Sequence, residues 1–487
     1  MGLVVSQSIK NTIATYIGFV IGGVNVLFLF TNFLSDAYFG LIQYIFSTAA
    51  IMMPLMAFGV HNTMVKFYSS FKTRQSQNSF LTLMLILPLF IALPIGLIGY
   101  ACFETISNWL TIKNEIIRDY IWLIYISAIW FAYFEVFYAW SKVQMQSVFG
   151  NFMKEIFHRL CTTLLLFALY FNFITVYQLI YALVAVHFIR MLIMAFYAFS
   201  LKLPIVCFAK LANLKVVLKY SALIIIAGSI ANIILEIDKF MIGLYIEIEN
   251  VAYYAVAIYI ASVIGVPSRA MHQITNPITA KLLNEKNKVE LKLLYQKSSL
   301  TLLIVSGLIF LLIVLNVNEL YHLIPEKFQG GISVVVLIGL AKLFDNLLGN
   351  NNAILFNSDY YKMVLALGFG LVLVTILLNV IFIPRFGTIG AAYATFISVI
   401  IYNTAKIIFV KRWFKITPFT INTLKVSAFI VLFFCLFYFW DFAFHPVLNI
   451  LFKSIAITIL YLCLVFYFKL SEDVTNMIKR FLSLIKS

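Results

Sequence analysis

Long apolar runs, each closed by a few charged residues, are the dominant pattern of this chain. In the stretch 220–267, one apolar run ends at Glu236, Asp238 and Lys239, and a second run, 251–266, follows at once. With its flanks, each run is long enough to cross a bilayer as a helix. Read along the whole chain, the pattern predicts about fourteen spans, at approximately 11–34, 38–58, 80–101, 120–141, 152–171, 177–199, 219–239, 250–272, 298–317, 331–354, 363–383, 388–410, 420–440 and 447–468.

The composition assigns this pattern to a membrane protein rather than to a soluble one. Of the 487 residues, 63% are hydrophobic and only 11% are charged, whereas soluble domains carry about 25% charged residues. A transmembrane β-barrel would show short alternating segments instead of continuous apolar runs. We therefore expect an all-α polytopic membrane protein.

The positive charges are distributed unevenly among the segments that join the spans. Counted with the N-terminus inside, the inner segments and the two chain ends hold most of the 35 Lys and Arg residues. This bias predicts both termini on the cytoplasmic side, and it explains most of the net charge of +16 without nucleic acid. The predicted inner segments are 60–79, 142–151, 200–218, 281–297 and 411–418, and the outward loops lie near residues 36, 113, 245, 325 and 443.

Short features recur at similar spacing in the two halves of the chain. Glu135 lies in the fourth span and Asp345 in the tenth, each directly after a phenylalanine, and Lys154 and Lys362 follow about one loop later. We interpret spans one to six and seven to twelve as parallel repeats, which are typical of transporters with a substrate path between the halves. Chance similarity among apolar residues is the alternative. The predicted domains are a six-helix bundle at 1–212, a second six-helix bundle at 213–415, and two extra helices with a cytoplasmic tail at 416–487.

The sequence shows no motif for catalysis or metal binding. Its five cysteines have no metal-binding spacing, and a P-loop, an HExxH motif and a nucleophile elbow are all missing. We therefore expect neither enzymatic activity nor a cofactor. Without a nucleotide site, transport would draw on a Na⁺ or H⁺ gradient, or on the gradient of the substrate itself.

Two segments resemble a known family. Residues 375–403 read TILLNVIFIPRFGTIGAAYATFISVIIYN, and an earlier segment contains DKFMIG followed by YYAVAIY. Both resemble the polysaccharide-exporter (Wzx-like) branch of the multidrug/oligosaccharidyl-lipid/polysaccharide superfamily, whose MATE-like plan of six, six and two helices also fits. The resemblance implies a flippase of the bacterial cytoplasmic (inner) membrane. It would move undecaprenyl-pyrophosphate-linked oligosaccharide repeat units from the inner to the outer leaflet by alternating access, for O-antigen, capsule or exopolysaccharide assembly, with a polysaccharide polymerase and chain-length proteins as candidate partners.

Such a substrate needs a hydrated cavity and fixed cations for its pyrophosphate. The candidate substrate-binding residues are three cations within predicted spans: Arg190, Lys342 and Arg269. Each has a structural alternative. The two arginines can extend toward the membrane surface, and Lys342 can pair with Asp345, which follows it by three residues.

A second group of polar residues is assigned to ion coupling. Asp238 closes the seventh span in the outer half of the membrane, and Thr375 and Asn379 reach the same half, four residues apart. Lipid II flippases, in the same superfamily, place a sodium site on these helices, and their spacing resembles Thr375, Asn379, Ala391 and Thr395 here. Asn379 stands where those proteins can carry a second carboxylate. Including the two acids of the repeat, the candidates are Asp238, Asn379, Thr375, Thr395, Glu135 and Asp345; the alternative is that Asp238 pairs with Lys239 or Arg385.

Three other functions compete with the oligosaccharide flippase. A cation-coupled multidrug antiporter of the same superfamily would need cavities dominated by acidic residues, whereas Arg190 and Lys342 favour an anionic ligand. A lipid II flippase would carry arginines on its first span, where this chain has no charge beyond Lys10. A membrane-embedded glycosyltransferase or polymerase would need a long outer loop, which the predicted spans do not leave.

Overall fold

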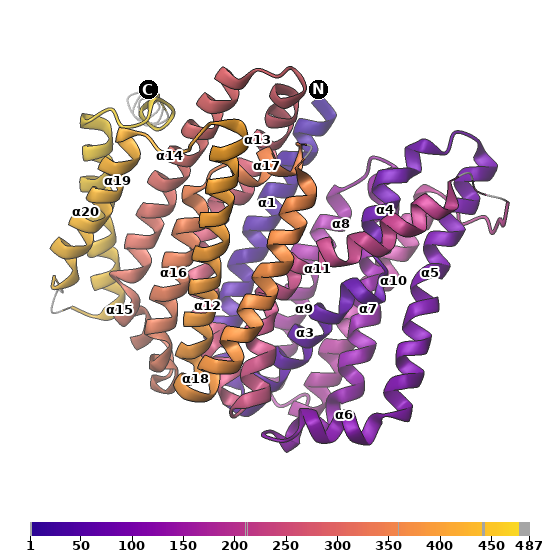
Figure 1. The fold of residues 1–487 in the computed structure, drawn as a ribbon. Helices are drawn as coiled ribbons and strands as arrows, with labels where there is room; N and C mark the ends of the chain where they lie inside the picture. Colours follow the sequence, from indigo (N-terminus) through magenta and orange to yellow (C-terminus); the bar gives the residue numbers. More distant parts are fainter. Residues whose placement is uncertain (1, 210, 212, 359, 441–443, 477–487) are drawn as a thin grey trace. The chain divides into compact units, whose positions relative to one another are not determined.

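The computed structural model describes residues 2–209, 211, 213–358, 360–440 and 444–476. Within these residues every regular element is a helix (Figure 1), and 11 helices are long and apolar enough to cross a membrane. The predicted all-α polytopic class is therefore confirmed. The predicted outward loop near residue 443 lies outside the described residues.

One very long helix contains two of the predicted spans. α18 (Tyr361–Phe414) covers both the eleventh and the twelfth, which meet at a kink at Gly387. The backbone there has φ 61° and ψ −138°, a conformation that glycine adopts readily and that strains other residues. The motif around Gly387 therefore marks the turn between two spans.

Two other predicted spans are not among the 11 candidates within the described residues. The fifth is divided into α8 (Val148–Phe152), the π-helical turn η4 (Met153–Phe157) and α9 (His158–Tyr170). The seventh lies within α11 (Leu214–Tyr245). The count of fourteen accordingly stays a prediction.

The chain divides into two compact units. Unit 1 comprises Met1–Ala255 and Asn379–Gly387, and unit 2 comprises Val256–Leu378 and Thr388–Ser487. This division places α11 in unit 1, because α11 packs against α3 (Asp36–Met56) and α4 (Val60–Phe67). The boundary between the two units therefore differs from the predicted boundary between the domains 1–212 and 213–415. The pair of repeated six-helix bundles stays a prediction.

Unit 1 is built around α7 (Ile121–Val143), which packs against α3, α4 and α10 (Val176–Leu201). Its core is rich in aromatic residues, including Phe80, Phe134 and Trp140, all buried. The remaining elements of this unit are α1 (Gly2–Val24), η1 (Asn25–Leu29), α2 (Phe30–Phe33), η2 (Tyr68–Ser70), α5 (Arg74–Ala101), α6 (Phe103–Leu110), η3 (Glu115–Tyr120) and the first half of α12 (Glu249–Ser262).

Local sequence signals position two helices of this unit. α10 begins with a capping box, in which Thr175 and Gln178 each accept a hydrogen bond from the other's backbone N–H. Between α3 and α4 the chain turns at Phe58 and Gly59, which have φ of 48° and 62°. The hydroxyl of Ser221 on α11 donates to the carbonyl of Phe58 at 2.7 Å, and this bond ties α11 to the turn.

Unit 2 is built around α14 (Lys288–Val314), which packs against α13 (Val266–Asn284), α16 (Ile332–Leu347), α19 (Ile421–Tyr438) and α20 (Pro446–Tyr467). The two helices beyond the predicted repeat, α19 and α20, lie side by side in yellow-orange in Figure 1. They share one apolar core with α14. The shorter elements of the unit are η5 (Val263–Gly265), α15 (Val317–His322), η6 (Glu326–Gly331) and α17 (Asn351–Phe356).

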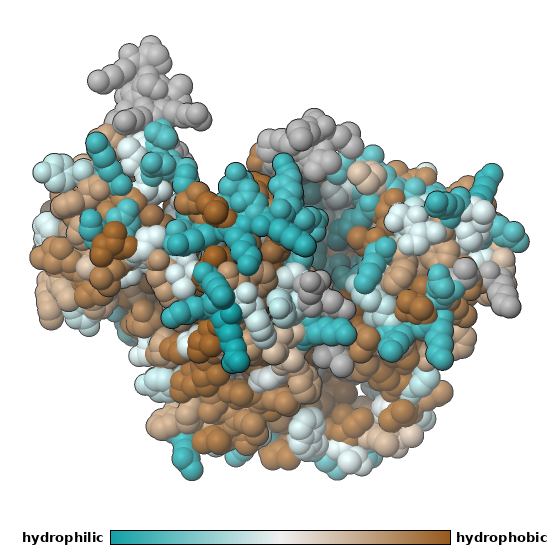
Figure 2. Space-filling model, turned by 45° about the horizontal axis from the view of Figure 1, so that its top comes forward, coloured by the Kyte–Doolittle hydropathy of each residue, from teal (hydrophilic) through white to brown (hydrophobic). Residues whose placement is uncertain are grey.

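The surface separates polar from apolar side chains. Figure 2 shows hydrophilic residues gathered over one end of the helices and hydrophobic residues over the adjoining sides. Large apolar side chains on the sides of α5, α10 and α19 are exposed, among them Phe90, Leu97, Phe196 and Leu436. Because lipid, and not water, is the solvent for such helix sides, they indicate a multi-pass membrane protein.

Gly40 on α3 provides a test of helix packing within unit 1. A Cβ at this position would lie 2.0 Å from the backbone carbonyl oxygen of Ile248. We expect Gly40→Ala to lower the free energy of unfolding by about 2 kcal/mol, because a backbone atom cannot move aside as a side chain can. Thermal unfolding in detergent measures the effect. Gly99→Ala is the matched control, since no atom lies within 4 Å of its Cβ, and equal melting temperatures for the two variants would contradict the packing.

Candidate functional site

Five charged residues come together inside unit 1. Glu135 lies on α7, Lys154 and Glu155 on the π-helical turn η4, Arg159 on α9 and Arg190 on α10. We call these residues the unit 1 charge cluster. Turns of π-helix occur often at functional sites, where they re-aim side chains out of the α-helical register. Here the turn supplies both Lys154 and Glu155.

The four flanking members of the cluster neutralise one another. Lys154 Nζ donates to Glu135 Oε1 at 2.6 Å, and Arg159 lies 3.5 Å from Glu155. The side chain of Glu135 is 13% exposed and that of Lys154 is 44% exposed, so their pair reaches solvent on one side. The predicted ion-coupling residue Glu135 is therefore paired with Lys154, which the sequence marked only as a feature of the proposed repeat.

Arg190 remains as the unbalanced charge of this cluster. It is 8% exposed, and its guanidinium carbon lies 4.2 Å from the centre of the Phe134 ring and 5.6 Å from that of Phe131. Its Nε is buried without a hydrogen-bond partner among the described residues. The structure thus holds the guanidinium over aromatic rings and leaves its Nε donor without a partner among the described residues, which is unusual for a buried arginine.

Three histidines, His61, His158 and His187, border the unit 1 charge cluster. His158 and His187 have ring centroids 5.7 Å apart, and His187 also contacts the rings of Phe46 and Phe131, each at 4.8 Å. Outside the spans, on α4, burial lowers the pKa of His61, so its imidazole is neutral at pH 7. The histidines therefore form part of the wall beside Arg190.

Asp238 is the centre of a second polar group in unit 1. It is 4% exposed and accepts hydrogen bonds from Tyr254 Oη at 2.6 Å and from Asn379 Nδ2 at 2.8 Å. Lys239 instead pairs with Glu236, at 2.5 Å. Asn379 is fully buried, and its Oδ1 has no partner among the described residues. Sequence spacing thus correctly brought Asp238 and Asn379 together, but it gave no sign of Tyr254.

The other two residues predicted beside Asp238 belong to unit 2. Thr375 is buried on α18, and its hydroxyl donates to the carbonyl of Leu371 one turn earlier, at 2.8 Å. Thr395 is half-buried on the second part of α18, beyond the kink. Their role in ion coupling stays a prediction.

Unit 2 contains a third group of charges, around a lysine that the sequence analysis missed. Lys406 on α18 is 1% exposed, and its Nζ lies 3.1 Å from Asn352 Oδ1, 3.8 Å from Asp345 Oδ1 and 4.3 Å from the centre of the Tyr402 ring. Asp345 therefore pairs with Lys406, and not with Lys342. The available signal was that Lys406 is the lone charge in the apolar stretch 388–410.

The two predicted cations of unit 2 lie on helices next to this group. Lys342 is half-buried on α16, and a Cβ on Gly265 would lie 3.6 Å from its Cδ, so its stem passes close to that glycine. Arg269 is exposed on α13, one turn beyond Gly265. Because α13 runs on to Asn284, Arg269 does not stand at the inner end of its helix, as the expected span 250–272 implied.

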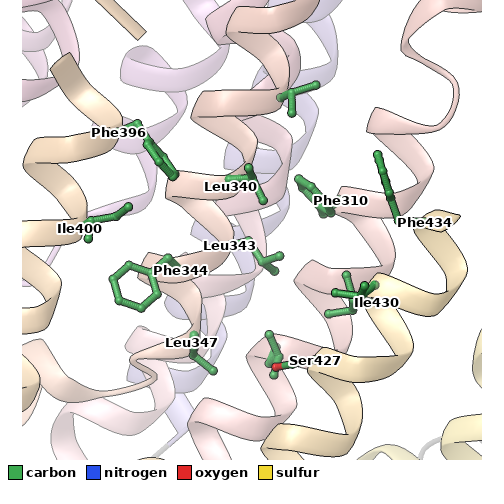
Figure 3. A pocket seen from close by; sticks show the side chains of 13 residues that line it. Phe310, Leu340, Leu343, Phe344, Leu347, Phe396, Ile400, Ser427, Ile430 and Phe434 are labelled. Atoms are coloured by element: carbon green, nitrogen blue, oxygen red, sulfur yellow. The ribbon is translucent and has the colours of Figure 1, made fainter. Parts of the chain in front are cut away.

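An apolar cavity of about 570 Å³ also opens in unit 2, between α14, α16, α18 and α19. Figure 3 shows Leu340, Leu343 and Phe344 on one side and Ile430 and Phe434 on another, with the hydroxyl of Ser427 at one end. Of the 13 lining residues, only Ser427 is polar. A cavity with such walls accepts an aliphatic chain and rejects a charged group.

Comparison with known proteins assigns the chain to a family. A family model described as polysaccharide biosynthesis protein matches residues 4–268, which is more than half of the chain. The chain belongs to this family. No curated protein sequence matches it significantly.

Solved structures of membrane transporters share this family member's fold. The lipid II flippase MurJ, in an inward closed conformation, has a TM-score of 0.75 and 17% identity over 94% of this chain and 99% of that chain. A multidrug resistance MATE family transporter, facing inward, has a TM-score of 0.58 and 14% identity over 88% and 95%. A Pyrococcus furiosus transporter described as having a binding pocket of reverse polarity has a TM-score of 0.56 and 15% identity over 88% and 96%.

These likenesses establish the fold of this polysaccharide biosynthesis family member. The family model confirms the predicted resemblance to a polysaccharide family, and the solved structures confirm the predicted MATE-like fold. At such low identities, a shared fold does not determine what is carried. The substrate has to be argued from the charge clusters and the apolar cavity.

Proposed function

We propose that this protein is a flippase that moves undecaprenyl-pyrophosphate-linked oligosaccharide repeat units from the inner to the outer leaflet of the bacterial cytoplasmic membrane. The observation that carries the proposal is Arg190, a buried guanidinium in unit 1 whose Nε has no partner among the described residues. A buried cation without full compensation is costly, so its retention favours a role in binding an anion. Pyrophosphate offers the multiple acceptor oxygens that a guanidinium fork binds well.

The balance of charge in unit 2 supports an anionic substrate over a cationic drug. Arg269, Lys342 and Lys406 lie on α13, α16 and α18 of unit 2, and Asp345, one turn after Lys342, pairs with Lys406 at 3.8 Å. A binding site for organic cations would need the opposite balance. We therefore propose Arg190 in unit 1, and Lys342 and Arg269 in unit 2, as substrate-binding residues of their respective units, and leave the drug antiporter as the alternative.

The apolar cavity supports a lipid-linked substrate. Its walls come from four helices of unit 2 and include Phe310, Phe396 and Phe434. An isoprenoid chain has only apolar surface, so it fits such walls without leaving a polar group unpaired. We propose that the first isoprene units occupy this cavity while the polar head group crosses.

A cation gradient is the proposed source of energy. Asp238 offers a buried carboxylate, and Asn379 offers its oxygen Oδ1, which has no hydrogen-bond partner within the part of the chain that the structure describes. Hard cations such as Na⁺ prefer oxygen ligands of these two kinds. Thr375 and Thr395 stay proposed ion-coupling residues, and H⁺ binding to Asp238 is the alternative to binding of a metal cation.

Transport by purified protein in proteoliposomes tests the proposal. The substrate is a fluorescent polyprenyl-pyrophosphate oligosaccharide, and leaflet exposure is read with a membrane-impermeant quencher. We expect protein-dependent exchange of this lipid between the leaflets and no efflux of ethidium from the same vesicles. Efflux of ethidium without lipid exchange would replace the flippase by the drug antiporter, and exchange of lipid II alone would assign the protein to peptidoglycan synthesis.

A further inference from the structure

The ion pair between Lys406 and Asp345 in unit 2 is incomplete. An ammonium group has three donors, and Lys406 uses one of them on the neutral amide oxygen of Asn352 at 3.1 Å. Its carboxylate partner lies farther away, at 3.8 Å. In unit 1, by contrast, Lys154 and Glu135 approach to 2.6 Å. The carboxylate of Asp345 is therefore farther from Lys406 than a direct charge-assisted hydrogen bond requires. An anion that approached Lys406 more closely would bind it more strongly.

The two members of this pair differ greatly in exposure. Lys406 is 1% exposed, whereas the side chain of Asp345 is 47% exposed. A buried lysine cannot leave without cost, because its stem is packed and its charge has to stay compensated. A half-exposed aspartate can rotate into solvent at little cost. Of the two groups, only Asp345 is free to exchange for another anion.

The surroundings of the pair would hold an incoming anion in place of Asp345. His272 on α13 lies within electrostatic range of both Asp345 and Lys406. Arg269 lies one turn before His272 on α13, and Lys342 lies one turn before Asp345 on α16. When Asp345 moves away, the remaining fixed charges here are positive. Such a site binds phosphate groups more strongly than it binds one carboxylate.

We propose that Asp345 is a placeholder anion, which occupies Lys406 until a phosphate group of the substrate displaces it. This inference rests on the proposed function, and it changes the role of Asp345 from coupling an ion to controlling access to Lys406. It assigns to Lys406 a direct contact with the diphosphate of a prenyl diphosphate. The competition keeps the buried lysine compensated while the site is empty, and it sets the affinity low enough for release.

Binding of farnesyl diphosphate to the purified full-length protein in an uncharged detergent tests this proposal by isothermal titration calorimetry. We expect Asp345→Asn to tighten binding about tenfold, because the competing carboxylate is gone. Adding Lys406→Met to Asp345→Asn is expected to abolish this gain in affinity. Adding Lys406→Arg to Asp345→Asn instead is expected to retain it. Glu285→Gln is the matched control, since Glu285 pairs with the exposed Lys281 of the same unit at 3.7 Å, and it should leave binding unchanged.

Three results of the farnesyl diphosphate titrations would overturn the placeholder role. They are weaker or unchanged binding in Asp345→Asn, a gain that persists without Lys406, and an equal gain in Glu285→Gln, which would indicate net charge alone. Tighter binding of phosphatidylglycerol without a change for farnesyl diphosphate would also overturn it, since the site would then serve bulk lipid. The titration measures binding without transport. If the protein exchanges the lipid-linked oligosaccharide but Asp345→Asn does not tighten binding, this inference alone is refuted. If Asp345→Asn tightens binding as expected but the protein exchanges no lipid-linked oligosaccharide, the proposed function alone is refuted.

Discussion

Replacing Arg190 with methionine is expected to reduce lipid exchange in proteoliposomes by about a hundredfold. A hydrogen bond to a charged partner contributes about 1.5–3 kcal/mol, and each 1.4 kcal/mol corresponds to about a factor of ten. Methionine keeps the apolar contact with Phe134 and removes the charge, so the loss reports on the guanidinium itself. Because Arg190 is buried, the amount of folded protein in the vesicles has to be measured alongside the rate.

Two further variants separate binding from structure at this position. Arg190→Lys keeps the charge without the planar fork and is expected to retain partial activity. Phe134→Leu removes the ring that lies 4.2 Å from the guanidinium carbon. The lost cation–π interaction is worth only about 0.5–2 kcal/mol, so lipid exchange should fall less than in Arg190→Met. Wild-type exchange by correctly folded Arg190→Met protein would exclude Arg190 from the substrate site.

Asp238→Asn is expected to uncouple transport from the ion gradient. The substitution removes the buried carboxylate that Tyr254 and Asn379 hold at 2.6 and 2.8 Å, and a neutral amide cannot balance the charge of a cation. We expect cation affinity to fall by about a hundredfold or more, since even outer partners of metal ligands are worth about 10–100-fold. The measurement is lipid exchange in inverted vesicles under imposed Na⁺ or H⁺ gradients.

Two other substitutions check that Asp238 acts through its charge. Tyr254→Phe removes one hydrogen bond and keeps the carboxylate, so gradient dependence should remain. Asn379→Asp adds a second carboxylate and should strengthen a dependence on Na⁺. If Asp238→Asn responds to both gradients as the wild type does, Asp238 has a structural role in joining α11, α12 and α18.

The sequence by itself determined the class of the protein and the location of its unusual residues. Apolar runs of span length are sufficient to predict membrane helices, because in lipid every backbone group has to be satisfied within the helix. The same logic singled out Arg190 and Asp238, since a charge inside an apolar run needs a reason to be there. The spacing of four residues on one helix predicted that Thr375 and Asn379 share a face.

Only the tertiary structure decided which charges compensate one another. Lys342 and Asp345 share a helix at a spacing suited to pairing, yet Asp345 faces Lys406 from a different helix, 61 positions away in the chain. Lys154 contacts Glu135 from a π-helical turn that no pattern in the sequence predicted. The partner of a buried charge is set by how helices cross and rotate against each other, and these depend on side-chain packing throughout the bundle. Periodicity along one helix contains no information about that rotation, so the residues were predictable from the sequence and their pairings were not.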